Sequence, residues 1–148
     1  MKYLTTLITG IALLSGTAYA DAVQINIADA KIATSMGNHK VGSAYLTISN
    51  PGQTPITLQN VTSPLADRVE IHTHVQKGEM MAMEKLDKLE IAAGTKAEFK
   101  PGGLHLMLFG LKEPVDEDAE VPLLLDFGNG MEMQVVAHGT PMQEMMAH

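Results

Sequence analysis

The chain has 148 residues, with 10 Lys and Arg, 17 Asp and Glu, 11 Met, no Cys and a net charge of −7. This acidic balance offers no basic face for a phosphate backbone and argues against nucleic acid as a partner. The lack of cysteine excludes disulfides and every metal site that needs a thiolate.

The first predicted element is a secretion signal over residues 1–20. Lys2 precedes an apolar run from Leu7 to Leu14, and the segment ends on the small-x-small sequence Ala18-Tyr19-Ala20. This is the pattern of a cleaved signal peptide. An uncleaved anchor is the alternative, but the run is far shorter than the roughly 20 residues that span a bilayer. We therefore expect cleavage after Ala20, a bacterial periplasmic location and no membrane span in the mature chain.

The rest of the chain predicts short strands separated by turn residues, with no convincing helical period. Clusters such as Asn50-Pro51-Gly52 punctuate alternating or β-branched stretches, and Gly128-Asn129-Gly130 predicts a hairpin turn. Strands at such spacing are typical of an all-β sandwich or barrel with Greek-key connections. The predicted strands are residues 23–27, 44–49, 56–61, 69–75, 81–83, 89–91, 96–100, 104–108, 121–127 and 131–136.

Two of these strands carry histidines on the face predicted to point away from the core. In RVEIHTHV, His72 and His74 alternate with apolar residues, and in LHLMLF, His105 and Met107 alternate with leucines. Because side chains alternate between the two faces of a strand, all four are predicted to lie off the core face. A single methionine in a strand is usually core packing. Histidine and methionine together on adjacent strands are harder to assign to packing.

The chemistry of this set favours copper. Thioether sulfur is soft and neutral, so it suits Cu(I) better than zinc, calcium or magnesium, and imidazole binds copper in either oxidation state. The segment GEMMAM, between the two strands, adds Met80, Met81 and Met83. A blue-copper centre is excluded because it needs a cysteine thiolate. No catalytic carboxylate pair, Ser/His/Asp order or phosphate-binding loop is evident, so we do not expect an enzyme.

The spacing His72-x10-Met83-x21-His105-x-Met107 reproduces the pattern His-x10-Met-x21-His-x-Met, and the chain resembles the PCuAC family of periplasmic copper chaperones. The segments AYLTISN, SPLADRVEIH and KPGGLHLMLFGL resemble the family as well, and the similarity covers residues 23–136. The resemblance implies a cupredoxin-like β-sandwich over residues 21–138 and a Cu(I) site made by the four motif residues. It also implies copper delivery toward the CuA centre of cytochrome oxidase, with a Sco-type protein or an oxidase subunit as partner.

One position departs from the family's pattern, and the chain end resembles the Met/His-rich extensions that some members carry. Family members often carry Met two residues after the first His, where this chain has His74, so His74 is either an extra nitrogen ligand or a solvated surface residue. Residues 139–148 show no strand pattern and are predicted to be a flexible tail. This tail is either an auxiliary copper site that can hold Cu(II) or a disordered end. The residues concerned are Met142, Met145, Met146 and His148, together with Met131, Met133 and His138.

The sequence therefore predicts a monomeric, non-enzymatic periplasmic copper carrier. One alternative is copper sequestration or resistance, which uses the same site without delivery to an oxidase. The other is a metal-independent β-sandwich interaction module whose methionines form a hydrophobic contact surface.

Overall fold

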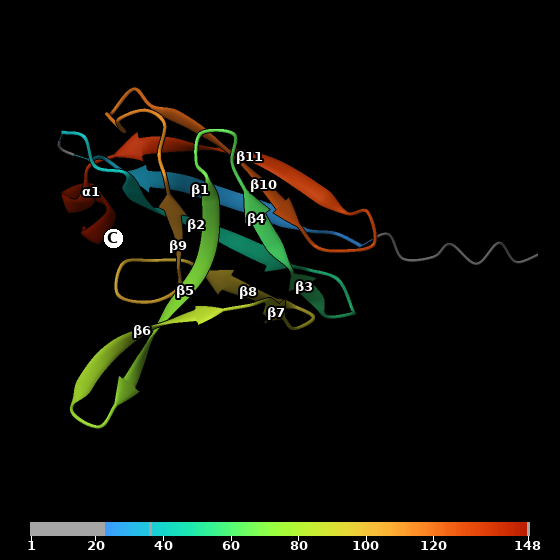
Figure 1. The fold of residues 1–148 in the computed structure, drawn as a ribbon. Helices are drawn as coiled ribbons and strands as arrows, with labels where there is room; N and C mark the ends of the chain where they lie inside the picture. Colours follow the sequence, from blue (N-terminus) through green and yellow to red (C-terminus); the bar gives the residue numbers. More distant parts are fainter. Residues whose placement is uncertain (1–22, 36, 148) are drawn as a thin grey trace, which may run out of the picture.

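The computed structural model describes residues 23–35 and 37–147, and this part of the chain is almost entirely β (Figure 1). The predicted signal segment and His148 lie outside the described residues. Within them, no helix has the length and apolar character that crossing a bilayer requires. The elements are β1 (Asn26–Ala33), β2 (Val41–Asn50), β3 (Ile56–Leu58), β4 (Asn60–Thr62), β5 (Arg68–Lys77), β6 (Met80–Leu86), β7 (Leu89–Ile91), β8 (Thr95–Glu98), β9 (His105–Phe109), β10 (Glu120–Asp126), β11 (Glu132–Thr140) and α1 (Met142–Met146).

Most of the strands belong to one long sheet. Its order is β4-β10-β11-β1-β2-β9-β5-β6, with β8 also paired to β2, and β3 and β7 form a separate pair. β1 runs parallel to β11, whereas β1 and β2, β2 and β9, and β9 and β5 are antiparallel. β4 also lies against β5, so the two halves of the long sheet face each other across the core. The predicted all-β sandwich is confirmed.

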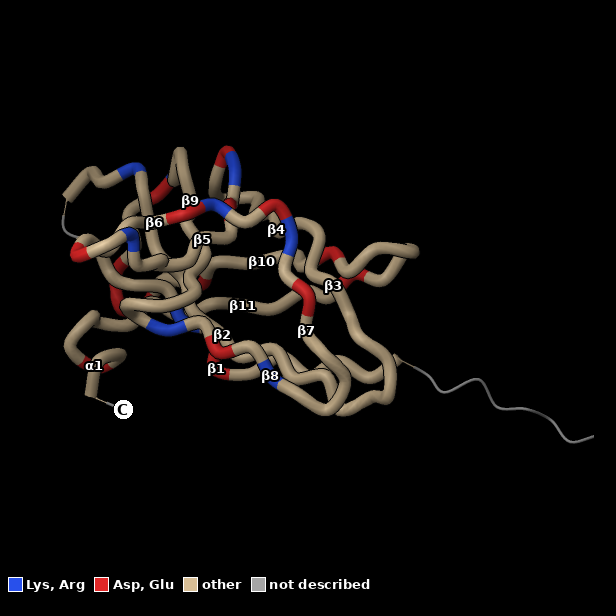
Figure 2. Tube along the Cα trace, turned by 90° about the horizontal axis from the view of Figure 1, so that it is seen from below, with Lys and Arg blue, Asp and Glu red and all other residues tan. Residues whose placement is uncertain are grey.

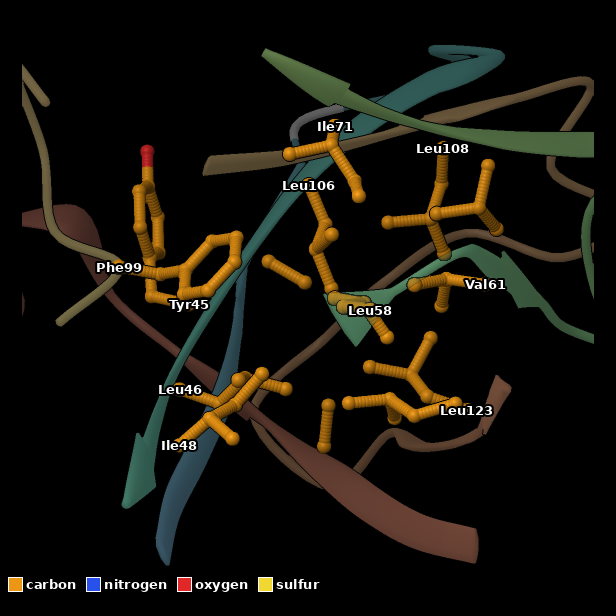
Figure 3. Packing of buried hydrophobic residues seen from close by; sticks show 14 of the residues in the cluster. Tyr45, Leu46, Ile48, Leu58, Val61, Ile71, Phe99, Leu106, Leu108 and Leu123 are labelled. Atoms are coloured by element: carbon orange, nitrogen blue, oxygen red, sulfur yellow. The ribbon is translucent and has the colours of Figure 1, made fainter. Parts of the chain in front are cut away.

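The core is built from the inward faces of these strands (Figure 3). Burying a leucine or isoleucine side chain contributes about 1.5–3 kcal/mol each, so this cluster is the main source of stability. The alternation of leucines in β9 puts its other face outside the core, and that orientation positions the candidate site. Fully buried members include Leu46, Ile48, Leu58, Leu106, Leu108 and Leu123.

Two predicted strands differ from the observed ones. The first, expected over residues 23–27, instead runs from Asn26 to Ala33, and a bulge at Asp29, with φ +55°, shifts its register against β2. Such a bulge adds one residue and breaks strict alternation. Ile25 before the bulge and the even-numbered Ile32 after it therefore both point into the core. The stretch 56–61 divides at Gln59 into two short strands that join different sheets.

The chain end also differs from the pattern-free tail predicted over residues 139–148. β11 continues through Thr140, and Pro141 then precedes the five-residue helix α1. Proline suits the start of a helix because its fixed φ is already helical and its missing N–H is not needed there. Met145 packs against the core and lines a small hollow with Tyr45, Phe99 and Pro101.

Lysine, arginine and acidic residues are interspersed up to Lys112, and eight Asp and Glu residues but no Lys or Arg follow it. In Figure 2 most of the trace is uncharged, and Asp and Glu alternate with Lys and Arg chiefly along the stretch from β6 to β7. The net charge of −7 therefore comes from the part of the chain after Lys112, whereas the candidate site below lies before it, where the two signs nearly balance.

Candidate metal centre

All four residues of the predicted motif lie on three neighbouring strands, β6, β5 and β9. His72 on β5 is directly opposite His105 on β9, and His74 is directly opposite Met83 on β6. Met107 follows His105 by two residues and shares its face. Directly opposite side chains have Cβ atoms about 5 Å apart and diagonal ones about 7–8 Å. This register therefore brings the motif residues, and His74 with them, to one region of the sheet.

Three imidazole rings cluster at the centre of this region. The ring of His105 lies 5.7 Å from that of His72 and 5.3 Å from that of His74, measured between centroids. Metal–nitrogen bonds are about 2 Å long, so either pair of rings is close enough to bind one ion. The ring spacing therefore allows His74 to replace or supplement His72.

His105 is the most enclosed member of the cluster. It points away from the leucine core, as alternation predicts, yet only 4% of it is exposed. Alternation did not indicate this burial, which arises because neighbouring strands and the turn before β9 surround the ring. Burial lowers the pKa of His105, an effect that outweighs its hydrogen bond to the Gly103 carbonyl. The ring is therefore held in the neutral form that binds metals.

Hydrogen bonds orient the imidazoles. Nδ1 of His105 lies 3.0 Å from the carbonyl oxygen of Gly103, and Nδ1 of His74 lies 3.3 Å from the same oxygen. A carbonyl only accepts, so both rings donate from Nδ1 and keep the lone pair on Nε2. Nε2 of His72 instead lies 2.8 Å from a carboxylate oxygen of Glu70. Sequence reasoning missed both Gly103 and Glu70 as contacts of the site.

The two thioethers come from the strands on either side of β5. Met83 is on β6, whose hairpin with β5 extends beyond the body of the fold (Figure 1), and 54% of it is exposed. Met107 is half-buried, and the Ser43 hydroxyl donates to its sulfur at 3.7 Å. Neither belongs to the buried core. Met81 shares the face of Met83 and is also exposed, so this hairpin presents two thioethers to solvent.

The donor set fits copper in its reduced state. Among residues 23–35 and 37–147, no three His, Asp or Glu side chains form a ready-made metal group. The residues on β5, β6 and β9 offer imidazole nitrogen and thioether sulfur, a mixture that suits Cu(I). In addition, Nδ1 of His72 is buried and has no hydrogen-bond partner. Buried polar atoms without partners are rare, and a bound metal ion would satisfy this one.

The structure divides the other candidate residues. Met131 and Met133 pack against the core near the start of β11, whereas the tail follows its far end. An extended strand rises about 3.3 Å per residue, so these methionines are too distant to join a tail site. Met145 is partly buried, while His138, Met142 and Met146 are exposed.

The sequence matches the family described as "Putative lipoprotein LpqE-like" over residues 25–138. The chain belongs to this family. It is also 30% identical over 112 residues to "Putative lipoprotein Lxx21020" from Leifsonia xyli subsp. xyli. That match covers 75% of the chain and 65% of the relative, so the chain spans just under two-thirds of the relative's length.

This LpqE-like chain has the fold of solved PCuAC domains. The copper-bound PCuAC domain from PmoF2 matches with a TM-score of 0.69 and 18% identity, over 81% of the chain and 96% of that domain. Apo-DR1885 from Deinococcus radiodurans matches with a TM-score of 0.62 and 27% identity, over 95% of the chain and 97% of that protein. The Cu(I) form of DR1885 matches with a TM-score of 0.61 and 27% identity, over 85% of the chain and 83% of that protein. The resemblance to the PCuAC family and its cupredoxin-like sandwich is confirmed.

Proposed function

We propose that this chain is a periplasmic copper carrier that binds one Cu(I) ion through His72, Met83, His105 and Met107. The main support is the register of β6, β5 and β9, which gathers two imidazoles and two thioethers on one face. The Cu(I)-bound state of DR1885, which shares the fold at 27% identity, supports the choice of metal and oxidation state. Binding and passing on an ion needs no catalytic group, so the proposed role is that of a carrier and not of an enzyme, and we propose that it acts as a monomer.

Delivery toward the CuA centre of cytochrome oxidase is the destination that we propose for the copper. It follows from the PCuAC-type motif, with a Sco-type protein or an oxidase subunit as the receiving partner. Met83, exposed on a projecting hairpin, supports transfer because an incoming ligand can reach its sulfur. Copper sequestration is the alternative function for the same site. An interaction module without metal is a less favoured alternative, because it leaves the buried Nδ1 of His72 unexplained.

A transfer experiment tests this function. The exported protein, purified without metal, is expected to take up one tightly held Cu(I) in anaerobic competition with a chromophoric chelator. Mixed with a metal-free CuA domain, alone or with a Sco-type protein, the loaded carrier should give rise to the CuA absorption bands. Tight binding without transfer would support sequestration, and no tight binding would exclude the carrier function.

An auxiliary copper site in the tail is a separate proposal. Its ligands would be Met142, Met145, Met146 and His148, and it would hold a second, weaker copper ion that can be Cu(II). The helical spacing of α1 supports a Met142–Met146 pair, because residues four apart share one face. Met145 contributes less, since it packs against the core beside Tyr45.

Truncation after Thr140 is expected to abolish the second copper equivalent and leave the first unchanged. Because truncation also removes the packing of Met145, the matched variant keeps the tail and replaces its three methionines with Leu and His148 with Gln. Both should lose the weaker equivalent in a copper titration followed by mass spectrometry. If either variant still binds two equivalents, the tail is not a copper site.

A further inference from the structure

The side chain of Glu70 lies beside the candidate copper site and contacts one of its histidines. Glu70 precedes His72 by two residues on β5, so both point to the same face. Its Oε2 atom lies 2.8 Å from Nε2 of His72, and its side chain is 18% exposed. Glutamate carboxylates are ionised at neutral pH and then only accept hydrogen bonds, so Glu70 is an acceptor in this contact.

An ionised carboxylate fixes which nitrogen of His72 carries the proton. It can only accept hydrogen bonds, so the ring must donate from Nε2. A neutral imidazole has one N–H, and Nδ1 of His72 is then left with a lone pair. That same Nδ1 is a buried atom with no hydrogen-bond partner. The nitrogen that Glu70 leaves unprotonated is therefore the one that lacks a partner.

The other carboxylate oxygen of Glu70 is held by two cations. Nε of Arg68 lies 3.1 Å from Oε1, and Nζ of Lys85, on β6, lies 3.9 Å from it. The guanidinium of Arg68 is itself stacked 4.1 Å above the ring of Phe109 on β9. These contacts hold Glu70 from its own strand and from β6, while Phe109 on β9 packs against Arg68, and they keep Oε2 directed at His72.

We propose that Glu70 is a positioning residue that keeps His72 in its Nε2–H form and reserves Nδ1 for the metal. This inference rests on the proposed copper site and assigns it an asymmetric geometry. His72 would bind through Nδ1, whereas His105 is oriented by Gly103 to bind through Nε2. Carboxylates that accept from the second nitrogen of a ligating histidine set its ring orientation and strengthen metal binding.

The test combines a readout without metal and a readout with metal. Long-range proton–nitrogen NMR spectra of the metal-free exported protein, recorded above the imidazole titration range, should show His72 as the Nε2–H tautomer. Glu70→Gln should keep this tautomer, because the amide oxygen still accepts from Nε2. Glu70→Ala should give a mixture of tautomers and lower the Cu(I) affinity by about 10–100-fold, with a smaller loss for Glu70→Gln.

Glu98→Ala is the matched control, since Glu98 is also a strand carboxylate in an ion pair, with Lys96 on β8. It should change neither the His72 spectrum nor the affinity. An Nδ1–H tautomer of His72 in the natural protein would overturn the proposal. So would a Glu70→Ala variant that keeps the natural Cu(I) affinity, whether or not its His72 tautomer changes. The spectrum of the metal-free protein does not depend on copper. Failure of the natural protein to bind Cu(I) would therefore contradict the proposed function separately.

Discussion

Replacing both Met83 and Met107 with leucine is expected to lower the Cu(I) affinity by more than about 100-fold. Loss of a residue that only orients a metal ligand already weakens binding by about 10–100-fold, and this variant removes both proposed sulfur ligands. Leucine preserves size and apolar character, so the substitution changes donor chemistry with little change in shape. Affinity is measured by anaerobic competition with a chromophoric Cu(I) chelator.

The same double variant should remain folded. Swaps between Met and Leu usually change the free energy of unfolding by less than about 1.5 kcal/mol. Met83 is mostly exposed, and Met107 lies outside the buried core. Urea unfolding of the metal-free proteins checks this expectation. A large loss of stability would instead assign the two methionines to packing.

X-ray absorption spectra show directly which atoms neighbour the bound copper ion. The Cu(I) protein should show both nitrogen and sulfur neighbours, and the double variant should lose the sulfur component. The control variant replaces Met131 and Met133 with leucine, because these two pack against the core away from the site. It should keep both the affinity and the sulfur signal. A shell of nitrogen and oxygen alone in the natural protein would exclude thioether ligation.

The strand pattern was predictable wherever alternation and turn residues agreed. The hairpin at Gly128-Asn129-Gly130 is confirmed: all three residues have positive φ, and Phe127 N–H donates to the Met131 carbonyl at 2.8 Å. Alternation also placed His72 and His105 on the correct face of β5 and β9. It failed in β1, where the bulge at Asp29 shifts the register, since one inserted residue moves every later side chain to the other face.

The end of the chain was less predictable for a different reason. A helix of five residues is too short to show a hydrophobic period, and isolated helices of this length are unstable in water. Packing of Met145 against the core supplies the stabilisation that the helix lacks on its own. Pro141 was the one local signal that could have indicated a helix start.

The candidate site was predictable in composition but not in geometry. Spacing and face identified the four motif residues, whereas strand order and register, which put β5 between β6 and β9, depend on contacts distant in sequence. The burial of His105 depends on the same contacts. Glu70 did have a local signal, because a carboxylate two residues before a histidine in a strand shares its face. Sharing a face does not by itself show a contact, and only the 2.8 Å distance between Glu70 and His72 identifies Glu70 as part of the site.

Cu(I) affinity is expected to fall as the pH falls, because protons compete with the metal for imidazole but not for thioether sulfur. A protonated imidazole must lose one proton before it binds copper. Each such ligand therefore weakens the Cu(I) affinity by about tenfold for every pH unit below its pKa. Burial lowers the pKa of His105, so this ring stays neutral below the range of a free imidazole, near about 6.5. Competition at His105 should therefore begin at a more acidic pH than at a solvated histidine.

With His72 and His105 as the nitrogen ligands, two protons are bound per copper released, and the affinity should fall by about 100-fold per pH unit at the acidic limit. His72→Ala should weaken binding and reduce the proton count by one. A count near three would add His74, whose ring lies 5.3 Å from that of His105. His74→Met should then restore a count of two and keep Cu(I) bound. An unchanged count in that variant would leave His74 outside the coordination shell, and a pH-independent affinity in the natural protein would exclude histidine ligation altogether.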